Sequence, residues 1–164
     1  MKDKFVILFV CTGNTCRSPM AAGALKSLLE KERAGKFEVI SAGTAAATGF
    51  PATMYAIEAA RVWDVDLSGH LSRSLTGALI DEADLILAMA PQHLKEVLRI
   101  RPDAGSKAFL FKNFPDAGGD GESVADPIGA SLEVYNRTFL EIGEYLGKFL
   151  DEIVKRIDEK TSDT

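Results

Sequence analysis

The sequence predicts a three-layer α/β protein, in which helices cover both faces of a four-stranded parallel sheet. Short apolar runs of strand length alternate along the chain with longer stretches whose apolar residues recur at helical spacing. These runs are almost wholly apolar, which is typical of parallel strands buried on both faces. With 164 residues, 46% of them hydrophobic and 26% charged, the chain suits one globular domain. We expect this domain to span residues 1–157 and the polar tail, residues 158–164, to be frayed.

Strands are expected wherever a short apolar run lies between polar or helical segments. The first run is Phe5-Val6-Ile7-Leu8-Phe9-Val10, and the run near the middle of the chain is almost as apolar. The predicted strands are residues 4–10, Phe37–Ala42, Asp84–Met89 and Lys107–Phe111.

Helices are expected between and after these strands. Pro19 suits the first turn of a helix over residues 19–33, and a second helix is expected over residues 51–63. The last helix, over residues 131–157, carries apolar residues at about 3.6 spacing. These residues are Leu132, Tyr135, Phe139, Ile142, Leu146, Phe149, Ile153 and Val154.

The segment from Asn113 to Pro127 is rich in proline, glycine and acids, so it predicts a long loop rather than a regular element. A loop of this length in a compact domain is usually functional or disordered. It ends in Asp126-Pro127, where the proline favours an extended Asp126. Taken alone, this pair is typical of a turn entering the following helix. Asp116 and Asp120 are expected to be solvated charges.

A polar turn, Cys11-Thr12-Gly13-Asn14-Thr15-Cys16-Arg17, joins the first strand to the first helix. Its backbone amides and the helix N-terminus can surround a tetrahedral oxyanion, and Arg17 can hold two oxygens with its planar fork. The same field is expected to lower the pKa of Cys11 and favour the nucleophilic thiolate. Gly13 and Asn14 suit positive φ. A Cys–(X)5–Arg pattern also occurs by chance, however, and a cysteine after a strand is often an inert small hydrophobe.

Residues 10–19, Val-Cys-Thr-Gly-Asn-Thr-Cys-Arg-Ser-Pro, resemble the signature of the low-molecular-weight protein tyrosine phosphatase family. Further similar segments follow in family order, and the resemblance covers about residues 4–150. These segments are Ser41–Thr44, Asp66–Ser72, Asp84–Met89 and Asp126–Pro127.

The resemblance implies a phosphotyrosine phosphatase I-like fold and hydrolysis of a phosphorylated protein through a phosphocysteine. Cys11 would attack phosphorus, Arg17 would hold the phosphoryl oxygens, and Asp126 would act first as general acid and then as base. Substrate or another oxyanion would bind in the loop. The binding residues would be Thr12, Gly13, Asn14, Thr15, Cys16 and Ser18.

Several loop residues have two readings. Asn14 resembles the family residue that braces the loop, although a turn would favour the same residue. Ser18 is expected to donate to the Cys11 thiolate, or else to cap the helix. His70 resembles a histidine that ties the loop down from below, whereas His93 is expected on a helix surface. In the family, Cys16 can close a disulfide with the nucleophile under oxidation, but it could equally pack beneath the loop.

The choice of substrate is predicted from the side chains expected to border the bound substrate, above all Thr15 on the wall of the loop. Thr15 stands where tyrosine phosphatases of the family commonly carry an aliphatic residue, and threonine there resembles the bacterial protein-arginine-phosphatase branch. Its hydroxyl could bond a guanidinium. Ile128 follows Asp-Pro, where an aromatic residue is common, although Phe50 or Phe114 could replace that ring. Phosphoarginine is therefore favoured and phosphotyrosine is the alternative, since threonine and isoleucine are also nearly isosteric.

Other functions are disfavoured by what the sequence lacks. Arsenate reductases of this fold need further cysteines, and none follows Cys16. A non-catalytic phosphate-binding module would not need Cys11, Arg17 and Asp126 together. The dinucleotide pattern G-x-G-x-x-G is absent after the first strand.

Charge and composition limit the partners and the compartment. A net charge of −5 argues against nucleic acid or a membrane surface as partner. No apolar run approaches the ~20 residues of a membrane span. No cofactor or metal is expected, because the two histidines are far apart in sequence and lack ligand-like neighbours. Two cysteines and no signal-peptide pattern indicate the cytoplasm.

Overall fold

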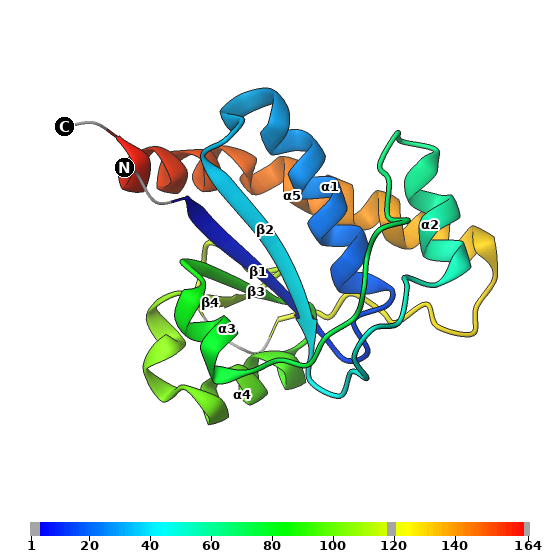
Figure 1. Ribbon diagram of the computed structural model, residues 1–164, viewed down its shortest axis with the longest axis horizontal. Helices are drawn as coiled ribbons and strands as arrows, with labels where there is room; N and C mark the ends of the chain where they lie inside the picture. Colours follow the sequence, from blue (N-terminus) through cyan, green and yellow to red (C-terminus); the bar gives the residue numbers. More distant parts are fainter. Residues whose placement is uncertain (1–3, 118–120, 163–164) are drawn as a thin grey trace.

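The computed structural model describes residues 4–117 and 121–162 and contains the predicted parallel sheet (Figure 1). Its strand order is β2-β1-β3-β4, with every pairing parallel. All four strands coincide with predicted ones to within two residues at each end. They are β1 (Phe5–Cys11), β2 (Phe37–Gly43), β3 (Leu85–Ala88) and β4 (Ala108–Leu110).

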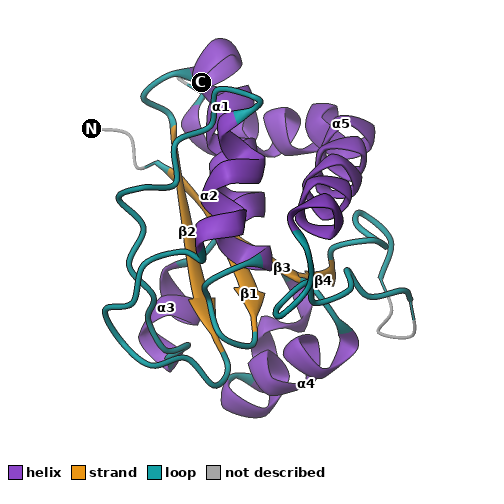
Figure 2. Ribbon diagram, turned by 90° about the vertical axis from the view of Figure 1, so that its right-hand side faces the viewer, coloured by secondary structure: helices purple, strands orange, loops and turns teal. Residues whose placement is uncertain are grey.

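Helices cover both faces of the sheet (Figure 2). One face packs on α1 (Arg17–Arg33), α2 (Met54–Arg61) and α5 (Leu132–Thr161), whereas the other packs on α3 (Gly77–Glu82) and α4 (Pro91–Ile100). A short 3-10 helix, Pro102–Ser106, adds to the second face. Along β1, alternate side chains enter the two cores, so the strand is buried throughout.

Helix α5 continues past the end predicted for it. Ile157 and Thr161 are buried on the core, and Arg33 Nε donates to Asp158 at 2.6 Å. The prediction of a frayed tail is therefore wrong for residues 158–161, because the helical spacing of buried side chains continues to Thr161. Residues 163 and 164 lie outside the described part of the chain.

The order of the strands places the site. The chain leaves β1 for β2 on one side and later returns to β3 on the other, so the carboxyl end of β1 is the point where the winding changes direction. Cys11 is the last residue of β1 and pairs with Gly43 at the end of β2.

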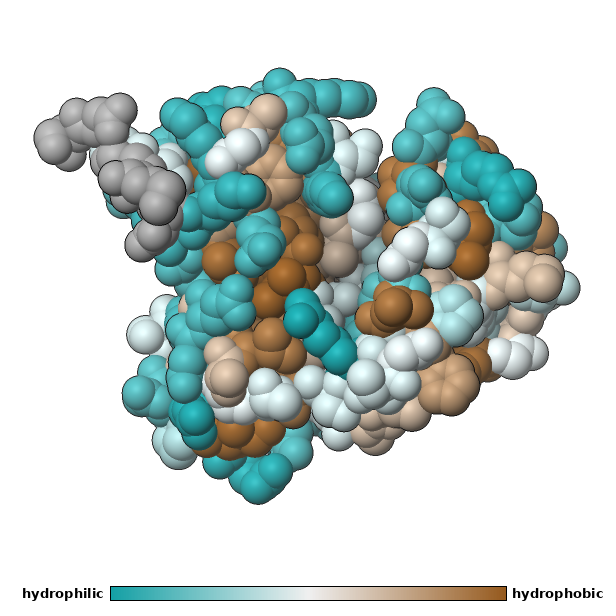
Figure 3. Space-filling model, in the orientation of Figure 1, coloured by the Kyte–Doolittle hydropathy of each residue, from teal (hydrophilic) through white to brown (hydrophobic). Residues whose placement is uncertain are grey.

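In Figure 3, apolar side chains gather along the middle of the face that β2 presents, between polar margins. Within the described residues, no helix combines the length and apolar character needed to cross a bilayer.

Candidate active site

The turn after β1 curls around Cys11 because Asn14 adopts a left-handed conformation, with φ of 58°. This confirms the expectation for Asn14 and corrects the one for Gly13, which is not among the positive-φ glycines. Gly43 is needed for a different reason: a Cβ there would lie 2.4 Å from the Thr12 carbonyl oxygen and 3.0 Å from Asn14 N. A glycine at the end of β2 therefore lets the loop pack directly on the neighbouring strand.

The Cys11 thiol lies among hydrogen-bond donors. Its Sγ is 2.8 Å from Ser18 Oγ, and the Asn14 amide donates to it at 3.3 Å. Asn14 Nδ2 in turn donates to Ser18 Oγ at 2.8 Å. Since that bond occupies a lone pair of Ser18, the hydroxyl hydrogen is free to point at Sγ. Ser18 is thus placed as the donor expected of it, and it makes no cap to an amide of its own helix.

The electrostatic balance at Cys11 differs from the one predicted. Burial is the largest effect and raises the pKa of the Cys11 thiol above its ordinary value. The Ser18 hydroxyl, the Ser18 and Asn14 amides and the Arg17 charge oppose it, each lowering the pKa. The sequence prediction of a lowered pKa counted these groups but not the desolvation. The thiolate must form against this burial, so the donors to Sγ decide how much of it exists.

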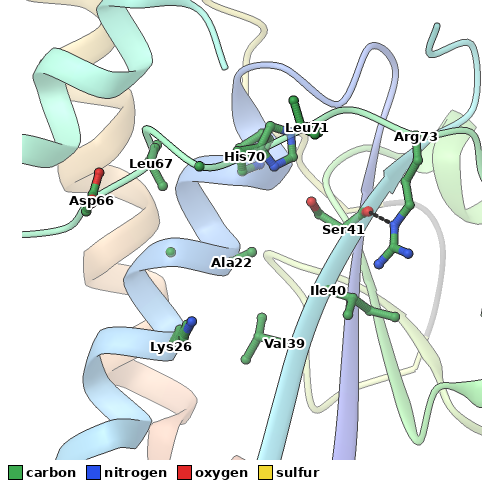
Figure 4. A pocket seen from close by; sticks show the side chains of 13 residues that line it. Ala22, Lys26, Val39, Ile40, Ser41, Asp66, Leu67, His70, Leu71 and Arg73 are labelled. Atoms are coloured by element: carbon green, nitrogen blue, oxygen red, sulfur yellow. Dashed lines mark hydrogen bonds between the residues drawn. The ribbon is translucent and has the colours of Figure 1, made fainter. Parts of the chain in front are cut away.

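Behind the loop, a dense set of hydrogen bonds holds Asn14, which is fully buried. Its Nδ2 donates to Ser41 Oγ at 2.9 Å, and its Oδ1 accepts from the Arg73 amide at 2.9 Å. His70 Nε2 donates to the Asn14 carbonyl oxygen at 2.6 Å. Figure 4 places Ser41, His70 and Arg73 around a groove of about 570 Å³ between α1, β2 and residues 66–73. Both Asn14 and His70 thus lie where the bracing roles predicted for them require.

Arg17 spans the front of the loop and is 5% exposed. Its Nη1 donates to the Val124 carbonyl oxygen at 3.0 Å, and its Nη2 donates to Thr12 Oγ1 at 3.3 Å. The Asp126 carboxylate lies 3.5 Å from Nη2. The Val124 amide donates to the Met89 carbonyl oxygen at 2.8 Å, which fixes this part of the long loop to the end of β3.

Asp126 stands at the rim of the site, with its side chain 42% exposed. Its Oδ1 accepts from the Ile128 amide at 3.1 Å. Helix α5 begins later, at Leu132, and is capped by Ser131. The Ala130 amide donates to the Pro127 carbonyl oxygen at 2.9 Å, so Asp126-Pro127 does lead into a turn before α5, as its alternative reading predicted. The same segment also brings Asp126 close to Arg17, so the turn does not exclude the predicted role of general acid, which stays a prediction.

The outer wall of the loop is open and makes few bonds. Thr15 is half-buried, and its Oγ1 lies 3.9 Å from Cys16 Sγ, too far for a strong bond. Ile128 is 63% exposed and Phe50 is 56% exposed. Phe114, in contrast, is buried and packs edge-on against two other phenyl rings, Phe109 and Phe149. The expectation that Phe114 could face the substrate is wrong, because the hydrophobic core takes its ring.

Cys16 packs beneath the loop, as one of its two readings predicted. Its buried Sγ lies 3.3 Å from Tyr135 Oη and 3.5 Å from Thr53 Oγ1. Burial and the bond to Cys16 raise the pKa of Tyr135 to about 12. Both cysteines are free thiols here, and their disulfide stays a prediction.

His93 does not lie on a helix surface, so that expectation is wrong. It is fully buried near the start of α4, with Nε2 2.8 Å from Thr12 Oγ1. Burial, reinforced by the Arg17 charge and partly offset by Asp126, lowers the pKa of His93 to about 4, so the ring is neutral at physiological pH. One sequence signal could have found it, because a helix that directly follows β3 starts at the same edge of the sheet as the loop.

Other residues of the site were also missed by sequence reasoning. Each contacts the loop from a distant segment by a bond that no local pattern announces. They are Ser41, Thr53, Arg73, Val124 and Tyr135.

The carboxyl end of β1 thus combines a thiol nucleophile, donors for an oxyanion and a carboxyl at the rim, and the class of protein that it defines is a cysteine-dependent phosphatase. The chain belongs to the low molecular weight phosphotyrosine protein phosphatase family, whose family model matches residues 6–161.

Relatives in this family have two named activities. A protein-arginine-phosphatase of Bacillus subtilis (strain 168) is 39% identical over 91% of this chain and 97% of its own length. The low molecular weight protein-tyrosine-phosphatase Etp of Escherichia coli (strain K12) is 35% identical over 81% of this chain and 84% of its own.

Solved structures are similar over nearly the whole chain. The YwlE arginine phosphatase from Geobacillus stearothermophilus has a TM-score of 0.82 at 35% identity, covering 94% of this chain and 96% of that one. A YwlE variant with a phosphorylated active-site serine has a TM-score of 0.83 at 36% identity, covering 93% and 99%.

Proposed function

We propose that this phosphatase hydrolyses phosphoarginine in proteins. The observation that carries the proposal is Thr15, whose weakly bonded hydroxyl stands on the wall of the loop that holds Cys11. A guanidinium presents several N–H donors in one plane, and a hydroxyl oxygen can accept one of them where an aliphatic side chain cannot. The name and 39% identity of the Bacillus subtilis protein-arginine-phosphatase support the same substrate.

The first chemical step breaks the P–N bond. The Cys11 thiolate attacks phosphorus, an S–P bond forms, and Asp126 gives its proton to the departing guanidino nitrogen. For this step the bonds of Arg17 to Thr12 and Val124 aim its fork across the loop. The loop amides and Arg17 hold the equatorial oxygens throughout, so their contribution is positioning and charge stabilisation.

The second step hydrolyses the phosphocysteine. A water attacks phosphorus, its proton passes to Asp126, and the S–P bond breaks to return the thiolate and inorganic phosphate. The relative with a phosphorylated serine in its active site supports a covalent phosphoryl intermediate. We also propose a cytoplasmic location, because a reducing compartment would keep the Cys11 nucleophile and Cys16 as thiols.

Phosphotyrosine is the second candidate, and specific side chains favour it. Tyr55 is 43% exposed beside a shallow pocket formed by the start of α2 and residues 129–131, and Phe50 is 56% exposed. Either ring could contact a phenyl group, although neither occupies the position after Pro127.

A direct comparison of substrates tests the proposal. The wild-type enzyme is assayed on two peptides of identical sequence, one with phosphoarginine and one with phosphotyrosine. The expected result is a higher kcat/KM for phosphoarginine. Better hydrolysis of the phosphotyrosine peptide would overturn the arginine assignment and leave the family assignment intact.

A further inference from the structure

His93 is a buried ring that the reaction does not use directly, yet it bonds the phosphate loop. Its Nε2 lies 2.8 Å from Thr12 Oγ1, and the same oxygen accepts from Arg17 Nη2 at 3.3 Å. Thr12 therefore stands between the histidine and the arginine. The His93 amide donates to the Ala90 carbonyl oxygen at 3.0 Å, which fixes the backbone of this residue in the first turn of α4.

The surroundings of the ring indicate which nitrogen carries the proton. Nδ1 is buried and has no hydrogen-bond partner among the described residues. A neutral imidazole has one N–H and one lone pair, and a buried N–H without a partner is the rarer and costlier of the two. The hydrogen is thus on Nε2, which donates to Thr12.

This assignment fixes the direction of the Thr12 hydroxyl. Arg17 can only donate, and His93 Nε2 donates as well, so both lone pairs of Thr12 Oγ1 are taken. The hydroxyl hydrogen must then point away from both groups, towards an acceptor. The Asp126 carboxylate lies 3.5 Å from the same Arg17 Nη2, and we expect an oxyanion bound in the loop to supply further acceptors beside it.

We propose that His93 is a positioning residue of the active site: by donating to Thr12, it makes that hydroxyl hold Arg17 and turns the hydroxyl hydrogen towards the phosphoryl group. The inference rests on the proposed phosphatase chemistry but not on the choice between phosphoarginine and phosphotyrosine. It assigns α4 a part in the site, in addition to the loop and the acid segment.

The tautomer is tested by ¹⁵N NMR of the side chains of the Cys11→Ser variant with and without inorganic phosphate. The chain has two histidines, so a His70→Gln variant assigns the spectrum. We expect His93 to be protonated on Nε2 and neutral at pH 7, both free and with phosphate. A ring protonated on Nδ1, or on both nitrogens, would overturn the proposal.

The effect of His93 on activity through Thr12 is tested by kinetics with p-nitrophenyl phosphate. This small substrate makes the test independent of which phosphorylated protein the enzyme acts on. His93→Leu removes the donor, whereas His93→Gln keeps an N–H near the position of Nε2. We expect kcat/KM to fall about tenfold in His93→Leu and in Thr12→Val, and to recover in large part in His93→Gln. The double variant His93→Leu/Thr12→Val should be no worse than either single one, because both remove the same interaction.

The contrary outcomes are distinct. If the losses in kcat/KM of the two single variants multiplied in the double variant, His93 would only fill space. The same would follow if His93→Gln were no more active than His93→Leu. Thermal unfolding would reveal whether His93→Leu fails to fold. In that case the NMR tautomer and a comparison of kcat/KM between Thr12→Val and Thr12→Ser still decide, because the serine variant keeps the hydroxyl and is expected to keep activity. Absence of turnover by the wild type on any phosphorylated substrate would instead reject the proposed function, while the NMR result would stand separately.

Discussion

The phosphate loop, residues 11–17, has two sides that are built differently. The rear comprises Asn14 and its partners Ser18, Ser41, His70 and Arg73, and the mouth comprises Thr15, Asp126 and Ile128. At the rear, Asn14 is fully buried and bonds to Ser18, Ser41, Arg73 and His70 at 2.6–2.9 Å. At the mouth, in contrast, the Thr15 side chain makes one weak contact among the described residues, 3.9 Å from Cys16 Sγ, while its carbonyl oxygen accepts from the Thr53 amide at 2.9 Å.

Other residues at the mouth are similarly open. The side chain of Asp126 is 42% exposed, and Ile128 is 63% exposed. The rear therefore keeps the geometry of the chemistry constant, whereas the mouth has few bonds that constrain which group it accepts. The predictions below first perturb the reacting groups, Cys11 and Arg17, and then one or the other of these two sides.

The largest effect is expected at the nucleophile. Cys11→Ser should abolish turnover, because a serine hydroxyl ionises far less readily than a thiol, while oxyanion binding and the fold persist. Steady-state assays and phosphate titration of the variant measure both. A serine variant that kept about a tenth of the wild-type rate would contradict the covalent mechanism.

Arg17→Lys should cost roughly a hundredfold to a thousandfold in kcat/KM, although the charge is kept. A lysine cannot bond Val124 and Thr12 at once while presenting two donors to the oxyanion. Kinetics with an aryl phosphate provide the measurement. Unchanged kcat/KM would mean that Arg17 acts as a charge and not as a fork.

The loop itself, residues 11–17, could be predicted from sequence far better than the residues that surround it. Strand, turn and helix follow one another locally, so periodicity, together with Asn14 and Pro19, indicated an anion loop at the end of β1. His93 was misplaced because its own sequence neighbours give no sign of burial against a distant threonine; only its position at the start of the helix that follows β3 pointed to the site. Phe114 and the pKa of Cys11 were misjudged for the same reason: burial depends on long-range packing.

Asp126→Asn should slow substrates with poor leaving groups by about a hundredfold and good ones much less, because only the former need a proton in the transition state. A series of aryl phosphates with different leaving-group pKa values measures this. An equal loss across the series would show that Asp126 at the mouth is not the general acid.

Ser18→Ala should raise the pKa of the Cys11 thiol further, since the Ser18 hydroxyl is the strongest of the groups that lower it. The thiolate is the reactive form, so alkylation by iodoacetamide should need a higher pH in the variant. Ser41→Ala is the matched control, because Asn14 Nδ2 bonds both serines and only Ser18 touches Sγ. Equal shifts in the two variants would contradict a direct effect of Ser18.

The most direct test of the central claim compares one mouth variant and one rear variant on both substrates. Thr15→Ile removes the hydroxyl that we propose to bond the substrate guanidinium, so kcat/KM for a phosphoarginine peptide should fall about tenfold to a hundredfold relative to that for phosphotyrosine. Ser18→Ala should lower both values and leave their ratio unchanged. If Thr15→Ile left the ratio unchanged, or Ser18→Ala altered it as much, the division between a rear that fixes chemistry and a mouth that selects substrate would be wrong.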